Sequence, residues 1–394
     1  MIRSIVLYTE EIDDLELATE ELFSQASGFE PDDNTFGIIC MDVDTDYPEL
    51  YGRLREKWDF PIVGGTAIGT LTGKDGFCKT GISVMLLTSK DCSFAVGMTK
   101  GLTSDNYIEP VRETIQALKK ELGSEHAGLV LTFGGKAKEG SGDDIVNAID
   151  ELGENLRLYG AYASDMFALT EYRAVCNERV ESGEMAFVLF SGNINPKFLS
   201  VQSLAGKVDF SYEVTGAEGN NVFRLGNGTF LEALERTGLD TGGGGVVVTK
   251  FIQTPFITSY DKPDGNHVES LRVLTRLNNE DGSGLFLGGI SEGSSLELGL
   301  FNRDDVKTSV GKAFDELFEW LKTEGTDNRT ILCCSCAARF LALGNNGLIE
   351  AESYQGRLPD DVSLMGMYSY GEFCPVGDKN VNVFHNYTFT ILSI

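Results

Sequence analysis

Short apolar runs alternate with amphipathic segments along most of the chain. Residues 4–9, 36–41 and 129–133 are continuous apolar runs, whereas residues 13–26 and 107–122 carry apolar positions three and four apart. Buried strands and amphipathic helices produce these two patterns. Their alternation predicts an α/β protein of mixed α+β character, with mixed sheets and flanking helices.

The pattern restarts part-way along the chain. Residues 60–98 and residues 157–201 each run from a strand into a glycine-containing turn, an irregular segment and a hairpin. The offset of roughly a hundred residues is far longer than a solenoid repeat. We therefore expect an internal duplication within an N-terminal module, residues 1–204, followed by a C-terminal module, residues 205–394.

The clearest helix is predicted at residues 302–322. One stripe of it is apolar and consists of Val306, Val310, Phe314, Leu317, Phe318 and Leu321. This spacing is that of a helix packed on a core. Asn302 or Asp304 can cap its start, and Gly325 lies beyond its end.

Composition and charge limit the classes of partner. The chain has 394 residues, of which 42% are hydrophobic, and this size predicts about two globular domains. Its 60 acidic and 32 basic residues give a net charge of −28, which repels phosphate backbones and anionic lipid, so we expect no nucleic acid partner. The sequence shows neither a signal peptide nor an apolar run near the ~20 residues that span a bilayer. We expect a cytoplasmic protein without membrane insertion.

The cysteines indicate buried thiols. Eight are present, mostly inside apolar strands, which is typical of a reducing compartment rather than of a disulfide framework. Cys333, Cys334 and Cys336 suggest zinc, but zinc ligands usually converge from turns. In a strand Cys334 and Cys336 would share one face and Cys333 would lie on the other. We expect no metal.

Two charged residues in apolar surroundings are the first site candidates. Arg339 follows the run ILCCSCAA, and Glu372 follows Tyr370 in MGMYSYGEFCP. Such residues are rarely buried without a partner. Arginine binds a carboxylate bidentately and a carboxylate binds an ammonium group, so we predict a site for a small polar molecule. The alternative is that the two form a salt bridge with each other or cap strands.

Further candidates lie in the same region. In the run FHNYTF, a strand would place His385 on one face and Asn386 and Thr388 on the other. We predict that these three residues and Tyr370 contact the ligand. Alternatively, Asn386 and Thr388 satisfy backbone groups at a sheet edge.

Glycine pairs after strands are weaker candidates. Gly64 and Gly65, in FPIVGGTAIG, could approach a ligand closely, or they could form a tight turn with positive φ. No glycine-rich segment completes the GxGxxG or GxxxxGK[ST] pattern, and no GxSxG motif is present, so we expect no cofactor. Ser164 and Asp165 are expected to be an exposed polar pair after a similar turn.

The segments FPIVGGTAIG, LRLYGAYASD, CSCAARFLALG, MGMYSYGEFCP and FHNYTF, taken in order, resemble the FIST family. The resemblance covers about residues 30–200 and 205–375, as an N-terminal and a C-terminal FIST module. It implies an intracellular sensor of signal transduction that binds a small ligand, with amino acids as the proposed class. Many members append an output module, which is absent after the last predicted strand, so we expect output through a signalling protein partner.

Two other classes of function stay open. The chain could be an enzyme, a hydrolase or transferase, that uses Cys334 or Cys336 as nucleophile with His385 as base. It could also be a scaffold that binds only protein, which would expose a large apolar patch. We consider the sensor the better interpretation of the two charged residues.

Overall fold

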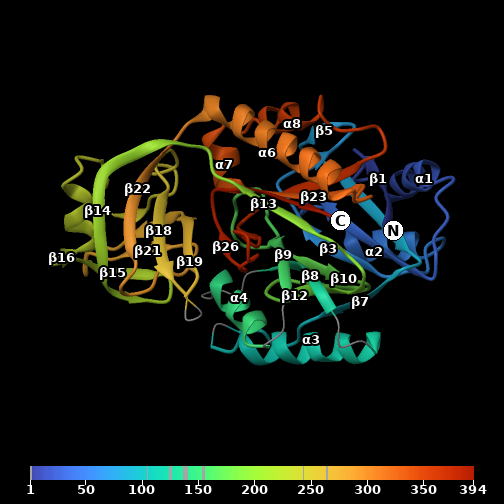
Figure 1. Ribbon diagram of the computed structural model, residues 1–394, viewed down its shortest axis with the longest axis horizontal. Helices are drawn as coiled ribbons and strands as arrows, with labels where there is room; N and C mark the ends of the chain where they lie inside the picture. Colours follow the sequence, from blue (N-terminus) through green and yellow to red (C-terminus); the bar gives the residue numbers. More distant parts are fainter. Residues whose placement is uncertain are drawn as a thin grey trace.

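The computed structural model describes residues 2–103, 105–123, 127–135, 141–152, 156–242, 244–262 and 265–394. These residues form eight α-helices and four β-sheets, which confirms the mixed α/β class. Three of the sheets form the body of the molecule, and the fourth lies to one side of it (Figure 1). None of the described helices combines the length and the apolar character needed to cross a bilayer.

Three six-stranded sheets share one plan. Sheet 1 contains, in order, β1 (Ile2–Thr9), β6 (Ile82–Ser89), β2 (Asn34–Met41), β3 (Ile62–Thr66), β10 (Ala174–Cys176) and β11 (Arg179–Glu181). Sheet 2 contains β7 (Cys92–Met98), β12 (Met185–Gly192), β8 (Ala127–Gly134), β9 (Arg157–Tyr162), β25 (Glu372–Phe373) and β26 (Phe384–His385). Sheet 3 contains β13 (Lys197–Val201), β27 (Phe389–Ser393), β23 (Thr330–Cys336), β24 (Ser363–Ser369), β4 (Thr70–Thr72) and β5 (Gly76–Cys78).

The three sheets also share a register. In each, the third and fourth strands are parallel and the other neighbours are antiparallel. One pair of opposed residues marks this register in each sheet: Ile39 with Gly64, Thr132 with Gly160, and Cys333 with Gly366. A Cβ at Gly64, whose φ is +150°, would lie 1.8 Å from the Ile39 carbonyl oxygen. Gly64 is therefore required inside a strand rather than in a turn.

The terminal hairpin of each sheet comes from another part of the chain. The β10–β11 hairpin pairs with β3, the β25–β26 hairpin with β9, and the β4–β5 hairpin with β24. The molecule therefore consists of three interlocked repeats: residues 2–89, residues 92–192, and residues 197–201 with 303–393. The predicted duplication is confirmed, and the third copy is new.

Helices cover the outer face of each sheet. They are α1 (Leu15–Gln25) and α2 (Tyr47–Leu54) on sheet 1, α3 (Ile108–Leu122) and α4 (Gly142–Asp150) on sheet 2, and α6 (Arg303–Glu324), α7 (Ala337–Ala342) and α8 (Leu348–Tyr354) on sheet 3 (Figure 1). The inner faces meet in one central core, which Cys40, Leu131 and Cys334 represent from the three sheets. Cys336 joins the outer cluster with Cys333 instead, because β23 ends there and α7 begins.

The fourth sheet is inserted between β13 and α6, and we call it the inserted sheet. Its strands are β17 (Gly245–Val246), β20 (Leu274–Leu277), β21 (Gly284–Phe286), β15 (Asn221–Leu225), β14 (Leu204–Glu218), β22 (Ser295–Phe301), β18 (Phe256–Asp261) and β19 (His267–Arg272), with β16 (Gly228–Thr229) beside β15. Together with α5 (Phe230–Glu235) it has a core of its own, drawn from residues 210–298. Leu204 opposes Phe301, so the insertion leaves and rejoins the third repeat at adjacent points.

Strands of the two predicted modules share sheets, since β24 pairs with β4 and β25 with β9. The division of the sequence at residue 204 stays a prediction.

The predicted caps of the longest helix are confirmed in detail. The Asn302 side chain accepts a hydrogen bond from the backbone N–H of Asp304 at 2.9 Å, and Gly325 closes the helix in the left-handed region.

Candidate functional site

Arg339 lies on α7 and is completely buried. Its Nε donates to Glu350 Oε1 at 2.8 Å, and its Nη1 donates to the Ser203 hydroxyl at 3.1 Å. Glu350 also accepts from the Tyr368 hydroxyl at 2.7 Å. Arg339 is therefore ion-paired with Glu350 of α8 and not with Glu372.

Glu372 is the first residue of β25 and is also completely buried. Its two carboxyl oxygens accept hydrogen bonds from the Ser369 hydroxyl at 2.7 Å and the Thr388 hydroxyl at 2.9 Å. Burial nevertheless raises the pKa of Glu372 to about 8, because the charged form loses its hydration. The structure thus joins two predicted site residues, Glu372 and Thr388, around a buried carboxyl group.

His385 and Asn386 lie beside this group. His385 Nε2 is 3.0 Å from the Cys374 carbonyl oxygen, and burial lowers the pKa of His385 to about 4. Asn386 Nδ2 donates to the His385 carbonyl at 3.0 Å. The predicted alternation of faces through FHNYTF is wrong, because β26 ends at His385 and Tyr387 adopts a φ of +65°.

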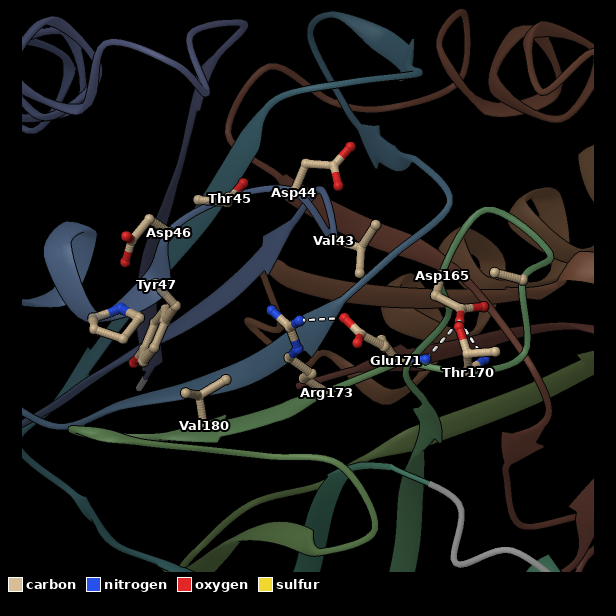
Figure 2. A pocket seen from close by; sticks show the side chains of 12 residues that line it. Val43, Asp44, Thr45, Asp46, Tyr47, Asp165, Thr170, Glu171, Arg173 and Val180 are labelled. Carbon is tan, nitrogen blue, oxygen red and sulfur yellow. Dashed lines mark hydrogen bonds and ion pairs between the residues drawn. The ribbon is translucent and has the colours of Figure 1, made fainter.

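A pocket of about 570 Å³ opens at the carboxyl end of β2 (Figure 2). One wall is the β2–α2 connection and the first turn of α2, with residues 43–48. The other wall is the loop of residues 165–173 and Val180 of β11, both from the second repeat. The pocket therefore lies where two repeats exchange a hairpin.

Asp165 organises the second wall. Its carboxylate accepts backbone hydrogen bonds from Leu169 at 2.8 Å, Thr170 at 2.6 Å and Glu171 at 2.8 Å. Burial acts to raise the pKa of Asp165, but these donors and the Tyr370 hydroxyl outweigh burial and hold it below its usual value. The expectation of an exposed polar pair is wrong, since Ser164 and Asp165 are both buried.

Tyr370 stands directly behind this wall. Its hydroxyl donates to Asp165 Oδ1 at 2.7 Å and accepts from the Phe167 backbone N–H at 2.8 Å. Phe167 has a φ of +69°, an uncommon conformation for a bulky residue that needs such support. On the other side, a Cβ at Gly65 would lie 2.8 Å from the Arg173 carbonyl oxygen. Tyr370 and Gly65 thus support the pocket rather than line it.

The pocket lining contains one cationic side chain, Arg173, together with the carboxylates of Asp44, Asp46, Asp165 and Glu171. Arg173 Nη2 pairs with Glu171 Oε2 at 2.6 Å on the second wall (Figure 2). On the first wall, Asp46 Oδ1 caps α2 by accepting from the Glu49 backbone N–H at 3.1 Å. The exposed Asp44 side chain has no hydrogen-bond or ion-pair partner within the described part of the chain. The pocket therefore offers a guanidinium group opposite carboxylates that no cation neutralises.

The first wall of the pocket was not predicted from the sequence, although the sequence contains a signal for it. The segment Asp-Val-Asp-Thr-Asp, residues 42–46, directly follows a buried strand. Ligands of α/β proteins commonly bind at the carboxyl ends of strands, so polar residues there are informative. Arg173 carries no comparable local signal, because its place in the pocket depends on the exchanged hairpin.

Two family models match the chain, one for the FIST N domain at residues 35–227 and one for the FIST C domain at residues 245–375. Together they cover most of its length. The chain belongs to the FIST family. FIST domains are associated with the sensing of small ligands in signal transduction. A comparison with curated proteins gave no match.

The pocket falls entirely within the FIST N match, whereas Arg339, Tyr370 and Glu372 fall within the FIST C match. The hydrogen bond between Tyr370 and Asp165 therefore joins the two FIST domains at the wall of the pocket. This contact depends on the way the repeats interlock.

All eight cysteines of this FIST protein lie in the described residues, and each is a free, buried thiol. Burial raises the pKa of Cys334 and of Cys336 well above the usual value, which disfavours the thiolate that a nucleophile needs. Within the described residues, no group of three or more His, Cys, Asp or Glu side chains is arranged to hold a metal ion.

Proposed function

We propose that this FIST protein is a cytoplasmic sensor that binds an amino acid or a related metabolite in the pocket and signals through a protein partner. The supporting observation is the charge pattern, with Arg173 in one wall of the pocket and the carboxylates of Asp44 and Asp46 in the other. An amino acid carries a carboxylate and an ammonium group. Arginine matches the first through a bidentate hydrogen-bond pair, and a carboxylate matches the second.

The size and the polarity of the pocket support the same proposal. Its volume of about 570 Å³ falls in the range of small-molecule sites. Thr45 lines it and is only 3% exposed, yet its hydroxyl has no partner among the described residues. A buried polar group without a partner is costly, so a ligand that bonds to Thr45 gains that energy.

The route of the signal is proposed to run through Tyr370. A ligand can change a conformational equilibrium only through its different affinities for the two states. The loop of residues 165–173 contributes Arg173 to the pocket and is held from behind by Tyr370 of the third repeat. Ligand contact with this loop would therefore alter the contact between the two FIST domains. A partner protein that binds one conformation more tightly would respond to this change.

A thermal-shift screen with amino acids, dipeptides, organic acids and nucleotides tests the proposal. A ligand at a hundred times its dissociation constant stabilises the native state by about 2.7 kcal/mol, or a few degrees in Tm for a chain of this size. We expect hits among amino acids, and Arg173→Met should remove them. The control is Arg112→Met, which changes an ion-paired arginine on α3 with similar exposure, 31% against 33%.

The proposal would be contradicted if no compound of the panel raised the Tm of the folded protein. A hit that survives Arg173→Met would contradict the assignment of the pocket. Direct ligand contact by Arg339, Glu372, His385, Asn386 and Thr388 stays a prediction. It requires the core to open around them, and unchanged ligand affinity in Glu372→Gln would refute it for that residue.

A further inference from the structure

The pocket has a counterpart in each of the other two sheets. Val180, Phe384 and Phe77 hold the same position in sheets 1, 2 and 3, opposite the residue that itself opposes Gly64, Gly160 or Gly366. Val180 lines the pocket. Phe384 and Phe77 therefore mark the equivalent places, which we call the second and third grooves; the pocket is the first groove.

The opposite walls are equivalent as well. Each is the start of the helix that follows the first of the two parallel strands in its repeat. Pro48 is the second residue of α2 and lines the first groove, and Asp143 is the second residue of α4. The first groove thus lies between Pro48 and Val180, and the second between Asp143 and Phe384.

The second groove is filled by Arg272 of the inserted sheet, which is completely buried. Arg272 Nη2 donates to Asp143 Oδ1 at 2.9 Å, and Nη1 donates to the Phe384 carbonyl at 3.0 Å. The guanidinium carbon lies 5.9 Å from the centre of the Phe384 ring. The guanidinium group of Arg272 is therefore bound by both walls of this groove, although Arg272 belongs to the inserted sheet and not to the repeats.

The third groove is closed by aromatic packing. The Phe77 ring lies 5.4 Å from the Phe340 ring, and a Cβ at Gly347 would meet Phe77 at 2.5 Å. In the first groove, Val180 and Pro48 stand at the matching points, and Tyr47 is also part of the lining.

We propose that the natural ligand of the first groove carries a guanidinium group, as free arginine does. This inference rests on the proposed function and narrows its ligand class. The chain itself shows what the equivalent groove accepts, since Arg272 is bound there by a carboxylate and a carbonyl. Arg173 Nη2 is paired with Glu171, and the other N–H groups of its guanidinium remain for the carboxylate of the same ligand.

The unused groups of the first groove agree with a cationic ligand. Glu171 is neutralised by Arg173, and Asp165 is occupied by backbone N–H groups of its own loop. Asp44 remains without a partner in the described part of the chain, and the hydroxyl of the buried Thr45 is also unpartnered there. A guanidinium group has five N–H donors, enough to satisfy both.

The two grooves differ in how the negative charge is supplied. A proline stands where Asp143 stands in the second groove, so the carboxylates come from Asp44 and Asp46 of the preceding connection. Val180 stands where Phe384 stands in the second groove, so a bound guanidinium lacks the cation–π contact that Phe384 makes with Arg272. The first groove is also exposed to water at Asp44, which allows a ligand to enter.

Calorimetric titration of the full chain with arginine and with citrulline tests this inference. Citrulline has nearly the same shape but carries a neutral ureido group. We expect arginine to bind and citrulline to bind at least about tenfold more weakly, since the carboxylates then face an uncharged group. Asp44→Asn should weaken arginine binding by about tenfold, whereas Asp33→Asn, an exposed carboxylate outside the pocket, should leave it unchanged.

The outcomes separate the two proposals. Equal affinity for arginine and citrulline, or a neutral amino acid that binds more tightly than arginine, would overturn the guanidinium inference and leave the amino-acid sensor intact. Arginine binding that neither Asp44→Asn nor Arg173→Met changes would overturn the placement in the first groove. Failure of every amino acid to bind the folded chain would overturn both.

Discussion

The first and second grooves occupy equivalent places in the fold, yet they present their arginines differently. In the second, Arg272 is fully buried and its partner Asp143 is 22% exposed; in the first, Arg173 is 33% and Glu171 64% exposed. A covered ion pair is costly to break, whereas an exposed one contributes little to stability. The same frame thus holds a buried ion pair where the inserted sheet covers it, and it forms an accessible pocket where no described element covers it.

A second difference explains why the first groove is deep enough to be a pocket. In the first and third repeats, the strand of the exchanged hairpin begins directly after a glycine, at Thr70 after Gly69 and at Glu372 after Gly371. The second repeat inserts the loop of residues 165–173 before β10. This added loop builds one wall, and its residues with positive φ indicate strain of the kind found at functional sites.

The largest effect is expected where the shared register itself is broken. Gly64→Ala and Gly160→Ala would each place a Cβ within 1.9 Å of a backbone carbonyl oxygen, so we expect losses of more than about 4 kcal/mol in unfolding free energy, or no folded protein. Gly28→Ala is the control, since its φ is also positive but no atom lies within 4 Å, and about 1–2 kcal/mol is expected. Urea denaturation measures all three. Equal losses at Gly64 and Gly28 would refute the common frame.

Much of this frame was predictable because it is local. The helical stripe from Val306 to Leu321 and the caps at Asn302 and Gly325 are short-range patterns, and the structure reproduces them. The duplication was visible for the same reason, since each copy in the first half is nearly continuous. The third copy was missed because the inserted sheet separates β13 from α6 by about a hundred residues.

The site was less predictable because its contacts join distant segments. Arg339 and Glu372 were correctly singled out as charges in apolar surroundings, but the partner of Arg339, Glu350, lies on another helix. Strand alternation could not place Asn386, because Tyr387 reverses the backbone with a positive φ. The pocket depends on an exchanged hairpin, which no local pattern encodes.

The next largest effect is expected at the buried ion pair in the second groove. Arg272→Met removes one partner of a desolvated ion pair and leaves the Phe384 and Gly289 carbonyls without their donor, so we expect a loss of about 3–5 kcal/mol in unfolding free energy. Urea denaturation followed by fluorescence measures it. A loss below about 1 kcal/mol would show that the inserted sheet is held by other contacts and that the two grooves do not differ in this respect.

A smaller effect, which depends on pH, is expected in the unfolding free energy at the exchanged strands. Sheet 1 has Ala174 where sheet 2 has Glu372, because each begins its hairpin strand. Burial raises the pKa of Glu372 from 4.5 to about 8, so between these values the folded state binds more protons than the unfolded state, and stability falls as pH rises. Glu372→Gln should therefore match the wild type near pH 4 and exceed it by a few kcal/mol near pH 9. An equal difference in unfolding free energy between the two proteins at pH 4 and at pH 9 would contradict this.

The smallest effect on stability is expected from the substitution that mirrors Arg272→Met. Arg173→Met breaks a pair that water reaches from both sides, so the loss in unfolding free energy should stay below about 1 kcal/mol and should disappear in 1 M salt, where exposed charges are screened. The loss in Arg272→Met should persist in salt, because solvent ions do not reach a fully buried guanidinium. A large, salt-resistant loss at Arg173 would mean that it supports the fold as Arg272 does, and would leave the pocket without a cation free to meet a ligand carboxylate.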